Sequence, residues 1–252
     1  MNLLDQKVFI VLIGLIVFFL LENIFPAEKI KFKNKTTRTF KNIFFWFVNI
    51  GLTPILILPI TIYATTFELH RLFIFENKIM EFCFQLIVMD LFLYFWHRAN
   101  HEIPFLWRFH HVHHLDETLD VSSGVRFHFG EVILSAIIRC LVIIIFNISI
   151  INLLIIEGII LIASAFHHSN IKLPKLFETY LSYIIVTPSI HWVHHHKKQK
   201  QTDSNYCTIF SFWDILFGTK SNFKRYQRMP IGVEGDKEQS IDKLILRPVI
   251  KK

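Results

Sequence analysis

The feature that most constrains this chain is a series of long apolar runs with few or no charges. One uncharged run covers 26 residues, from Asn42 to Phe67, and another extends from Val8 to Leu21. A helix needs about 20 apolar residues to cross a hydrocarbon core of about 30 Å. Because lipid offers no partner for free backbone polar groups, such runs fold there as helices. We therefore expect an all-α, integral membrane helical bundle.

Two further segments have the same character. The segment 80–96 is apolar apart from two acidic residues, and the 35 residues of 132–166 hold only one Arg and one Glu. The longer segment is sufficient for two spans with a turn near 147–152, which predicts about four to five spans in all. Residues 180–190 are too few to cross, and we expect them at the interface or packed against other helices.

The run near the N-terminus resembles the apolar core of a signal peptide. Asp5 precedes Lys7 there, and no small-residue cleavage pattern follows the run. We therefore expect a retained transmembrane helix.

Composition excludes several other classes. Hydrophobic residues make up 52% of the chain and charged residues 19%, against about 25% charged in a soluble domain. Three scattered cysteines are too few for a disulfide framework or a cysteine-based zinc site, and we interpret them as small apolar residues. The net charge is +7, and the basic residues lie in short runs beside apolar stretches, at 29–41 and 197–200. This arrangement favours an anionic membrane surface, and not a nucleic acid, as their partner.

Charge in the loops predicts the orientation. The segment 29–41 between the first two spans is rich in lysine, so the positive-inside rule places it in the cytoplasm. By counting crossings, the residues after Trp96 and after Phe166 emerge on that same side. We therefore expect a cytoplasmic histidine-rich cap, on a bacterial inner membrane or on the endoplasmic reticulum.

Histidine is the residue that indicates chemistry. Of 14 histidines, 13 lie between His97 and His196, and His70, the remaining one, is expected on the opposite side. Asp90, His97 and His101 fall on one stripe of the third predicted span. An intramembrane Asp is costly, so we expect Asp90 to orient His97.

The pattern H-x-x-H-H occurs twice, and on a helix it places three imidazoles on one face. The residues are His110, His113 and His114, then His191, His194 and His195. The repeat predicts two similar tripods that converge on one centre. So many imidazoles exceed the roughly three protein ligands of a catalytic zinc, which argues for two metals. The zinc-protease pattern H-E-x-x-H is absent.

The histidine motifs occur in an order that resembles the fatty acid hydroxylase and sterol desaturase superfamily. The matching positions are Asp90, Tyr94, His97, Arg98 and His101; Trp107 to His110, His113 and His114; Arg126, His128 and Glu131; His168, Ser169 and Asn170; Thr187, Pro188, His191, His194 and His195; Asn205 and Tyr206; and Trp213, Asp214 and Leu216 to Thr219. Two residues depart from the common pattern, His196 and Cys207, and neither alters the ligand spacing.

This resemblance implies a membrane-bound oxygenase with two non-haem irons, which uses O2 and two electrons to hydroxylate or desaturate a lipid. The implied iron ligands are His97, His101, His110, His113, His114, His191, His194 and His195, with His128 and His168 as additional candidates. Sterol, fatty acyl, ether lipid and carotenoid substrates all stay open. We expect three parts, namely N-terminal transmembrane helices and a basic loop in 1–80, a catalytic domain in 81–220 and a C-terminal tail in 221–252.

Further residues receive expected roles. We expect Asp90, Glu102 and Asn170 to support catalysis, Glu102 as a carboxylate beside the metals and Asn170 as a donor to a ligand or a water. Asp120, Arg126 and Glu131 are expected to form an ion network beside His128. His111 and His196 fall off the tripod stripes and are expected to be bystanders.

No nucleotide loop or haem-attachment motif is present, so electrons must come from a separate haem protein, ferredoxin or reductase. The basic run 197–200 would serve to dock that donor or to anchor the chain to the membrane. Two other classes stay open. A membrane zinc hydrolase predicts a water-activating carboxylate near zinc, and a non-enzymatic metal carrier or sensor predicts histidines along a path through the membrane.

Overall fold

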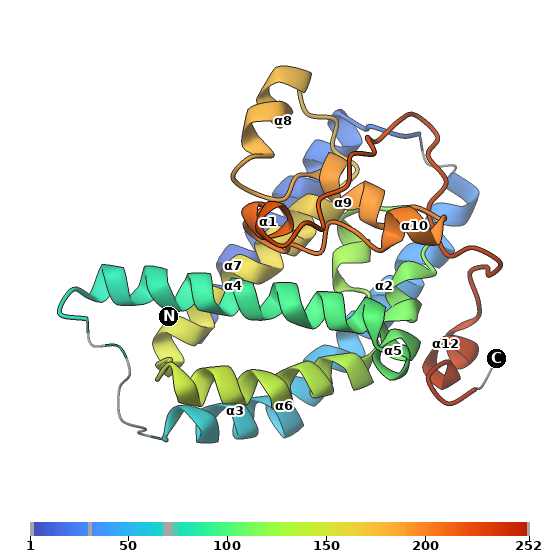
Figure 1. The fold of residues 1–252 in the computed structure, drawn as a ribbon. Helices are drawn as coiled ribbons and strands as arrows, with labels where there is room; N and C mark the ends of the chain where they lie inside the picture. The colour runs from blue at the N-terminus through green and yellow to red at the C-terminus, as the bar shows by residue number, and fades with distance from the viewer. Residues whose placement is uncertain (1–2, 30–31, 68–72, 74, 251–252) are drawn as a thin grey trace.

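The computed structural model describes residues 3–29, 32–67, 73 and 75–250, and throughout these residues the regular structure is helical (Figure 1). The elements are α1 (Leu3–Ile24), α2 (Phe32–Leu52), the π-helical turn η1 (Thr53–Ile57), α3 (Leu58–Thr65), α4 (Lys78–Glu102), α5 (Pro104–His114), the 3-10 turn η2 (Val121–Val125), α6 (Phe129–Ile145), α7 (Ile150–His168), α8 (Lys175–Leu181), α9 (Pro188–His194), α10 (Gln199–Thr202), α11 (Phe212–Leu216) and α12 (Ile241–Leu246). His70 lies outside the described residues.

Four helical stretches are long and apolar enough to cross a membrane. They cover Leu4–Ile24, Lys35–Thr65, Lys78–Glu102 and Ile150–His168. Helix α6 adds a fifth apolar helix of 17 residues, which packs against α3. The expected all-α membrane bundle is therefore confirmed. The turn between α6 and α7 falls at 146–149, where Asn147 adopts a left-handed conformation with φ of 47°, which asparagine tolerates.

An ion group joins three helices inside the bundle. The carboxylate of Glu157 on α7 lies 2.6 Å from Lys7 Nζ on α1 and 3.2 Å from Arg139 Nη2 on α6. Charged side chains in lipid are costly and are usually paired with one another. The single carboxylate of Glu157 thus pairs with both cations, Lys7 and Arg139.

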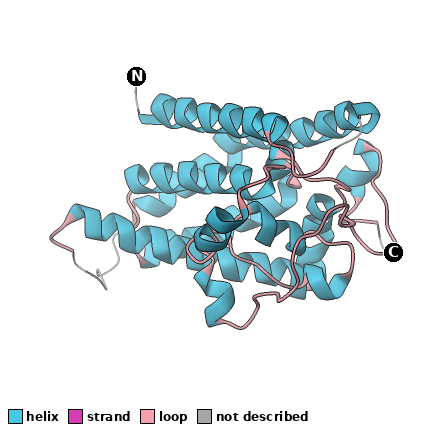
Figure 2. Cartoon of the chain, turned by 90° about the horizontal axis from the view of Figure 1, so that it is seen from above, coloured by secondary structure: helices cyan, strands magenta, loops and turns pink. Residues whose placement is uncertain are grey.

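The shorter elements form a cap at one end of the long helices. Figure 1 shows α5, α10 and α12 gathered at the end of α4, and Figure 2 shows the loops collected at the end that holds the C-terminus. Residues from α2, α5 and α12 share one small core of Phe45, Val112, Leu115 and Leu244. The C-terminal segment is therefore packed into the cap.

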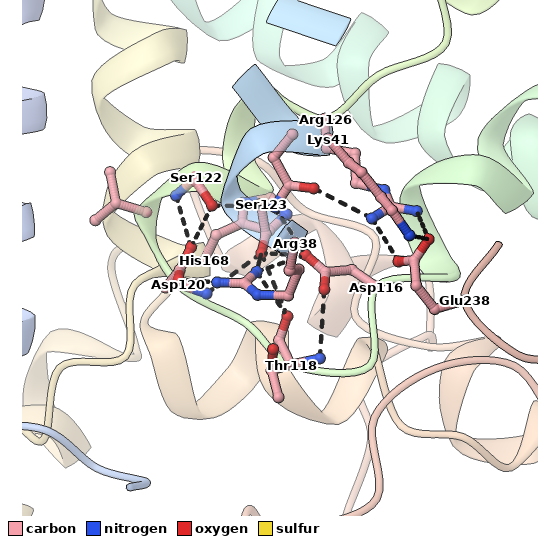
Figure 3. A network of polar contacts seen from close by, with 12 residues as sticks. Arg38, Lys41, Asp116, Thr118, Asp120, Ser122, Ser123, Arg126, His168 and Glu238 are labelled. Carbon is pink, nitrogen blue, oxygen red and sulfur yellow. Dashed lines mark hydrogen bonds and ion pairs between the residues drawn. The ribbon is translucent and has the colours of Figure 1, made fainter. Parts of the chain in front are cut away.

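Buried ion pairs fasten α2 to this cap (Figure 3). Arg38 donates to the carboxylates of Asp116, at 2.7 Å, and of Asp120. Arg126 donates to Glu238 at 2.6 Å, which ties the C-terminal segment to the same network. Buried charges of this kind are stable only when paired, so the network fixes where the lysine-rich N-terminal segment meets the cap.

Candidate metal centre

Nine histidines meet inside the cap in two adjacent groups. The first group is His97, His101, His110, His114 and His194, and the second is His113, His168, His191 and His195. Within each group, one ring nitrogen from every member lies within 4.8 Å of the corresponding nitrogens of the others. Imidazole suits iron, zinc, copper and nickel, so each group has the composition of a transition-metal site.

Two prolines, Pro104 and Pro188, fix the residues at which α5 and α9 begin. Ile103 has an extended backbone because it precedes Pro104, so α4 ends there and α5 starts at once. Thr187 is extended before Pro188 for the same reason, and α9 starts there. Because each of these short helices begins at a defined residue, the directions in which its histidine side chains leave the helix axis are also defined.

The structure corrects the expected arrangement of two tripods. Each H-x-x-H-H motif contributes to both groups. His110 and His114 of α5 join the first group while His113 joins the second; His191 and His195 join the second while His194 joins the first. The physical reason is that residues four apart lie above one another on a helix, whereas the residue between them is rotated away.

The second group has the spacing of ligands that share one ion. Nε2 of His168 lies 3.0 Å from Nε2 of His113 and 2.9 Å from Nε2 of His191, and the His191–His195 separation is 3.1 Å. Two imidazole nitrogens that bind one ion at about 2.0–2.1 Å are roughly 3 Å apart when their bonds stand at right angles. The residues present therefore fit a metal ion.

Backbone carbonyls orient several of the rings. Nδ1 of His97 donates to the carbonyl of Tyr206 at 2.8 Å, and Nδ1 of His194 donates to that of Ser204 at 2.7 Å. Nδ1 of His113 donates to a carbonyl at 3.1 Å. A carbonyl only accepts, so Nδ1 holds the proton and the Nε2 lone pair is directed into the group, as in metal-binding histidines. Asn205, at φ of 55°, shapes the turn that presents the first two carbonyls.

Two carboxylates serve the same purpose. Glu131, buried on α6, accepts from Nδ1 of His110 at 2.9 Å and from Asn100 at 3.2 Å. Asp203 lies 3.4 Å from Nδ1 of His101. A carboxylate behind an imidazole raises the basicity of that ligand and fixes its orientation.

Buried nitrogens without a protein partner point to the same conclusion. They include Nε2 of His101, His110 and His194 and both ring nitrogens of His114. An unsatisfied buried polar atom costs about 1–3 kcal/mol, which a metal ion would relieve. Burial holds the pKa of His113 and of His114 well below the ordinary value and lowers that of His194 to about 3. The rings are thus neutral, the form that binds a metal.

Among the residues expected to bind metal, the structure brings nine together and places His128 apart. His168, named as an additional candidate, lies in the second group. His128 uses both ring nitrogens elsewhere: Nε2 donates to the carbonyl of Ile245 at 3.0 Å, and Nδ1 accepts from the backbone of Gly130 at 3.0 Å. His128 therefore caps α6 and attaches the C-terminal segment.

The structure places the Asp90 carboxylate against a segment of the cap. Its carboxylate accepts from the backbone N–H groups of Ile209 and Phe210, at 3.0 and 3.1 Å, and from the indole of Trp213 at 2.9 Å. It therefore anchors the segment that follows the carbonyl of Tyr206. Asp90 therefore acts on His97 through that segment. The spacing of residues on a helix could not indicate this, because it does not reveal which distant loop lies against the helix.

Glu102 and Asn170 also lie away from both groups. Glu102 is exposed and forms an ion pair of 2.7 Å with Arg98, one turn earlier on α4. Asn170 exchanges hydrogen bonds with the backbone of Glu28, and its own N–H donates to Glu22. The contacts described for these two residues involve no histidine of either group.

Of the ion network expected beside His128, Asp120 and Arg126 belong to the buried network around Arg38, whereas Glu131 faces the first histidine group. Asp120 pairs with Arg38, Arg126 with Glu238, and Glu131 with His110. His111 and His196, the expected bystanders, lie outside both groups.

Sequence reasoning passed over His167. It is buried, donates from Nδ1 to the carbonyl of Thr208 at 3.1 Å, and its ring centroid lies 4.1 Å from that of His191. It sits directly before His168 at the end of α7, which is the signal that could have found it.

Comparison with known proteins agrees with this geometry. A family model described as fatty acid hydroxylase matches residues 82–219, which covers more than half of the chain. The chain belongs to the fatty acid hydroxylase family. The matched residues contain all nine grouped histidines, so the family's sequence pattern coincides with the candidate metal centre.

Several relatives of this fatty acid hydroxylase domain have names that refer to different lipids. The chain is 29% identical over 150 residues to an ornithine lipid hydroxylase of Rhizobium tropici, a match covering 60% of this chain and 44% of the relative. It is 31% identical to an alkylglycerol monooxygenase of Danio rerio, covering 52% and 28%, and 30% identical to a very-long-chain aldehyde decarbonylase of Oryza sativa subsp. japonica, covering 57% and 24%. The matches thus span less than half the length of these relatives. No solved structure matches the chain.

Proposed function

We propose that this protein is a membrane-bound lipid oxygenase that holds two irons in the two histidine groups. It uses O2 and two electrons to hydroxylate a lipid C–H bond, with desaturation as the related outcome. The observation that carries the proposal is the pair of adjacent, neutral, all-imidazole groups at the end of a membrane bundle. Membership of the fatty acid hydroxylase family and relatives named as lipid hydroxylases support it.

The chemistry divides between the metals and the protein. Iron would supply the redox steps with O2 that no ordinary side chain can perform on an unactivated C–H bond. The histidines would bind it, and the carboxylates of Glu131 and Asp203 and the carbonyls of Ser204 and Tyr206 hold the rings in place. Phe127, stacked on His113 with ring centroids 4.4 Å apart, excludes water from one side.

A zinc hydrolase is the less favoured alternative. It requires a carboxylate that activates water beside the metal. Two carboxylates beside the groups, those of Glu131 and Asp203, face Nδ1 of grouped histidines and so lie behind the rings. A metal carrier is disfavoured because the nine histidines gather at one end of the helices.

The orientation and the partners form part of the proposal. The cap faces the cytoplasm, since the lysine-rich segment after α1 lies on the cap side, where Glu28 contacts Asn170. A separate electron donor, a haem protein, ferredoxin or reductase, approaches from that side, and the lipid comes from the bilayer. In this proposal residues 81–220 are the catalytic domain, residues 1–80 are N-terminal transmembrane helices with a basic loop, and residues 221–252 are a C-terminal tail.

The decisive experiment is metal analysis of the purified protein, followed by anaerobic reduction and an O2-uptake assay with membrane lipid. We expect two irons per chain and lipid-dependent O2 uptake. One zinc and no O2 uptake would refute the proposal. His113→Ala should abolish uptake and leave membrane insertion intact, and His196→Ala is the matched control, because Nδ1 of His196 already accepts from the backbone of Lys198.

A further inference from the structure

An open cavity of about 1010 Å³ lies beside the first histidine group. His101 and Tyr206 form part of its wall, and because the side chain of His101 is fully buried, the first histidine group lies directly behind that wall. The remaining lining residues are mostly polar or charged: Arg98, Glu102, Lys200, Gln201, Asp203, Ser204, Gly218, Thr219, Lys220, Ser221, Asn222 and Phe223.

The cavity stands at the depth of the lipid head groups. Helix α4 has 25 residues, which at 1.5 Å per residue is about 37 Å and exceeds a hydrocarbon core of about 30 Å. Counted from Ile79, the first apolar residue of α4, about 20 residues end near Arg98. Arg98 and His101 therefore lie at the boundary between hydrocarbon and head groups.

An apolar strip leads from the bilayer to this cavity. On α11, Ile215 and Leu216 are 51% and 66% exposed. Phe217 stacks on Tyr94 of α4, with ring centroids 5.1 Å apart, and so lies at hydrocarbon depth. The chain then turns at Gly218, whose φ of 70° favours glycine, and becomes the cavity wall. A lipid tail on this strip would have its head in the cavity.

The charges of the wall favour an anion. Three cationic side chains face two carboxylates. The carboxylates already have partners: Glu102 binds Arg98 at 2.7 Å, and Asp203 accepts from Gln199 at 2.9 Å. Lys220 lies over the ring of Tyr183, 5.4 Å from its centroid, at the edge between strip and cavity. Lys200 and Lys220 are thus placed to bind a phosphate or carboxylate.

We propose that this cavity binds the anionic head group of a membrane lipid, and that the oxidised C–H bond lies in the head group or in the carbons next to it. The second part rests on the proposed function. One oxygen atom of O2 enters the C–H bond to give an alcohol; the other leaves as water, with two electrons and two protons supplied by the reduced donor. Because the first histidine group lies directly behind the cavity wall, a head group bound in the cavity places the carbons next to it nearer to that group than the end of the tail.

An acidic electron donor is the competing occupant of Lys200 and Lys220. The lipid is favoured because the cavity is a hollow whose wall includes His101, and because an exposed apolar strip leads into it. Donor proteins dock on surfaces and have no use for such a strip.

The binding test uses the full chain in detergent and dihexanoyl phosphatidylglycerol as the probe, measured by calorimetry. The double variant Lys200→Gln/Lys220→Gln should bind the probe at least about tenfold more weakly, a loss typical of charge-assisted contacts. The double variant Lys172→Gln/Lys175→Gln removes two exposed lysines elsewhere and should bind normally. Equal binding by the cavity variant would overturn the proposal. Glycerol 1-phosphate that bound as tightly as the lipid would also overturn it, since the site would then take free phosphate esters.

The product test follows oxidised lipid by fragmentation mass spectrometry in reconstituted membranes. We expect the new oxygen in the head group or on the adjacent carbons, and oxygen at the far end of a chain would overturn the second part. Slower reduction by a donor, with lipid binding unchanged in the cavity variant, would assign the lysines to the donor. Lysine-dependent binding without any lipid oxidation would support the head-group site and refute the proposed oxygenase.

Discussion

Nδ1 of His110 on α5 lies 2.9 Å from the carboxylate of Glu131 on α6. This contact joins the first histidine group to a membrane helix outside it. Because Glu131 also accepts from Asn100 of α4, one buried carboxylate connects three helices at the metal centre. Its removal should disturb metal binding more than the fold.

Glu131→Gln should lower metal affinity by about 10- to 100-fold, the usual effect of losing a partner behind a ligand. The amide keeps the size of the side chain but removes its charge. Metal content after dialysis against a weak chelator measures the effect. Glu102→Gln is the control, because Glu102 pairs with Arg98 at the surface. Equal metal content in the two variants would show that the Glu131 carboxylate does not tune its ligand.

The pair His168→Ala and His128→Ala separates ligand from cap. His168 contacts His113 and His191 through Nε2, so its loss should remove one metal and the activity. His128 caps α6, so its loss should cost about 1 kcal/mol of stability and leave both metals bound. Metal analysis and thermal unfolding measured on both variants distinguish these outcomes. Loss of metal from His128→Ala with normal stability would reverse the assignment.

Asp90→Asn should loosen the segment that carries the carbonyl for His97. The amide presents N–H donors to groups that are themselves donors, the backbone of Ile209 and Phe210 and the indole of Trp213. We expect a loss of about 1–3 kcal/mol in stability, with a lower metal content. Unfolding in detergent measures the first and metal analysis the second. Asp242→Asn, at an exposed site on α12, should change neither.

The carboxylate of Asp116 should make stability depend on acid. Burial alone would raise its pKa, but the charges of Arg38 and Arg126 and hydrogen bonds from Ser123 and Asn42 together hold the pKa below the ordinary 3.8. A lowered pKa means that this stabilisation is complete above about pH 4 and is lost as pH falls through the native value.

Arg38→Gln should cost about 3–5 kcal/mol at neutral pH, because it leaves buried carboxylates unpaired. The difference in stability between wild type and variant should then shrink as the pH falls below 4, once Asp116 is protonated. Unfolding of both proteins from about pH 3 to pH 7 measures this difference. A difference that stays constant over the range would contradict the account.

From the sequence, the membrane helices and the class of chemistry could be predicted well, whereas the contacts between individual residues could not. Apolar runs need no knowledge of the fold, since lipid permits only helices. The spacing of residues on a helix likewise predicted that the imidazoles of each H-x-x-H-H motif lie on one side of their helix. It did not indicate that His113 would turn from its neighbours to a second group, because that depends on where α7 delivers His168.

Residues with long-range partners account for the other differences. Asp90 meets a segment about 120 positions away, and His128 meets Ile245 across 117. The spacing of neighbours within a motif carries no information about such partners. His128 stands in a family motif and is buried, as a ligand would be, yet its environment makes it a helix cap.

The alternation of histidines along α5 has a consequence for assembly. A single rigid turn of helix carries ligands of both groups, so an ion bound in one group also fixes the helix that presents ligands to the other. The two metal positions are therefore coupled, and we expect the two ions to bind cooperatively. The first ion to bind orients α5 and α9 for the second. A half-filled protein should accordingly be scarce at equilibrium.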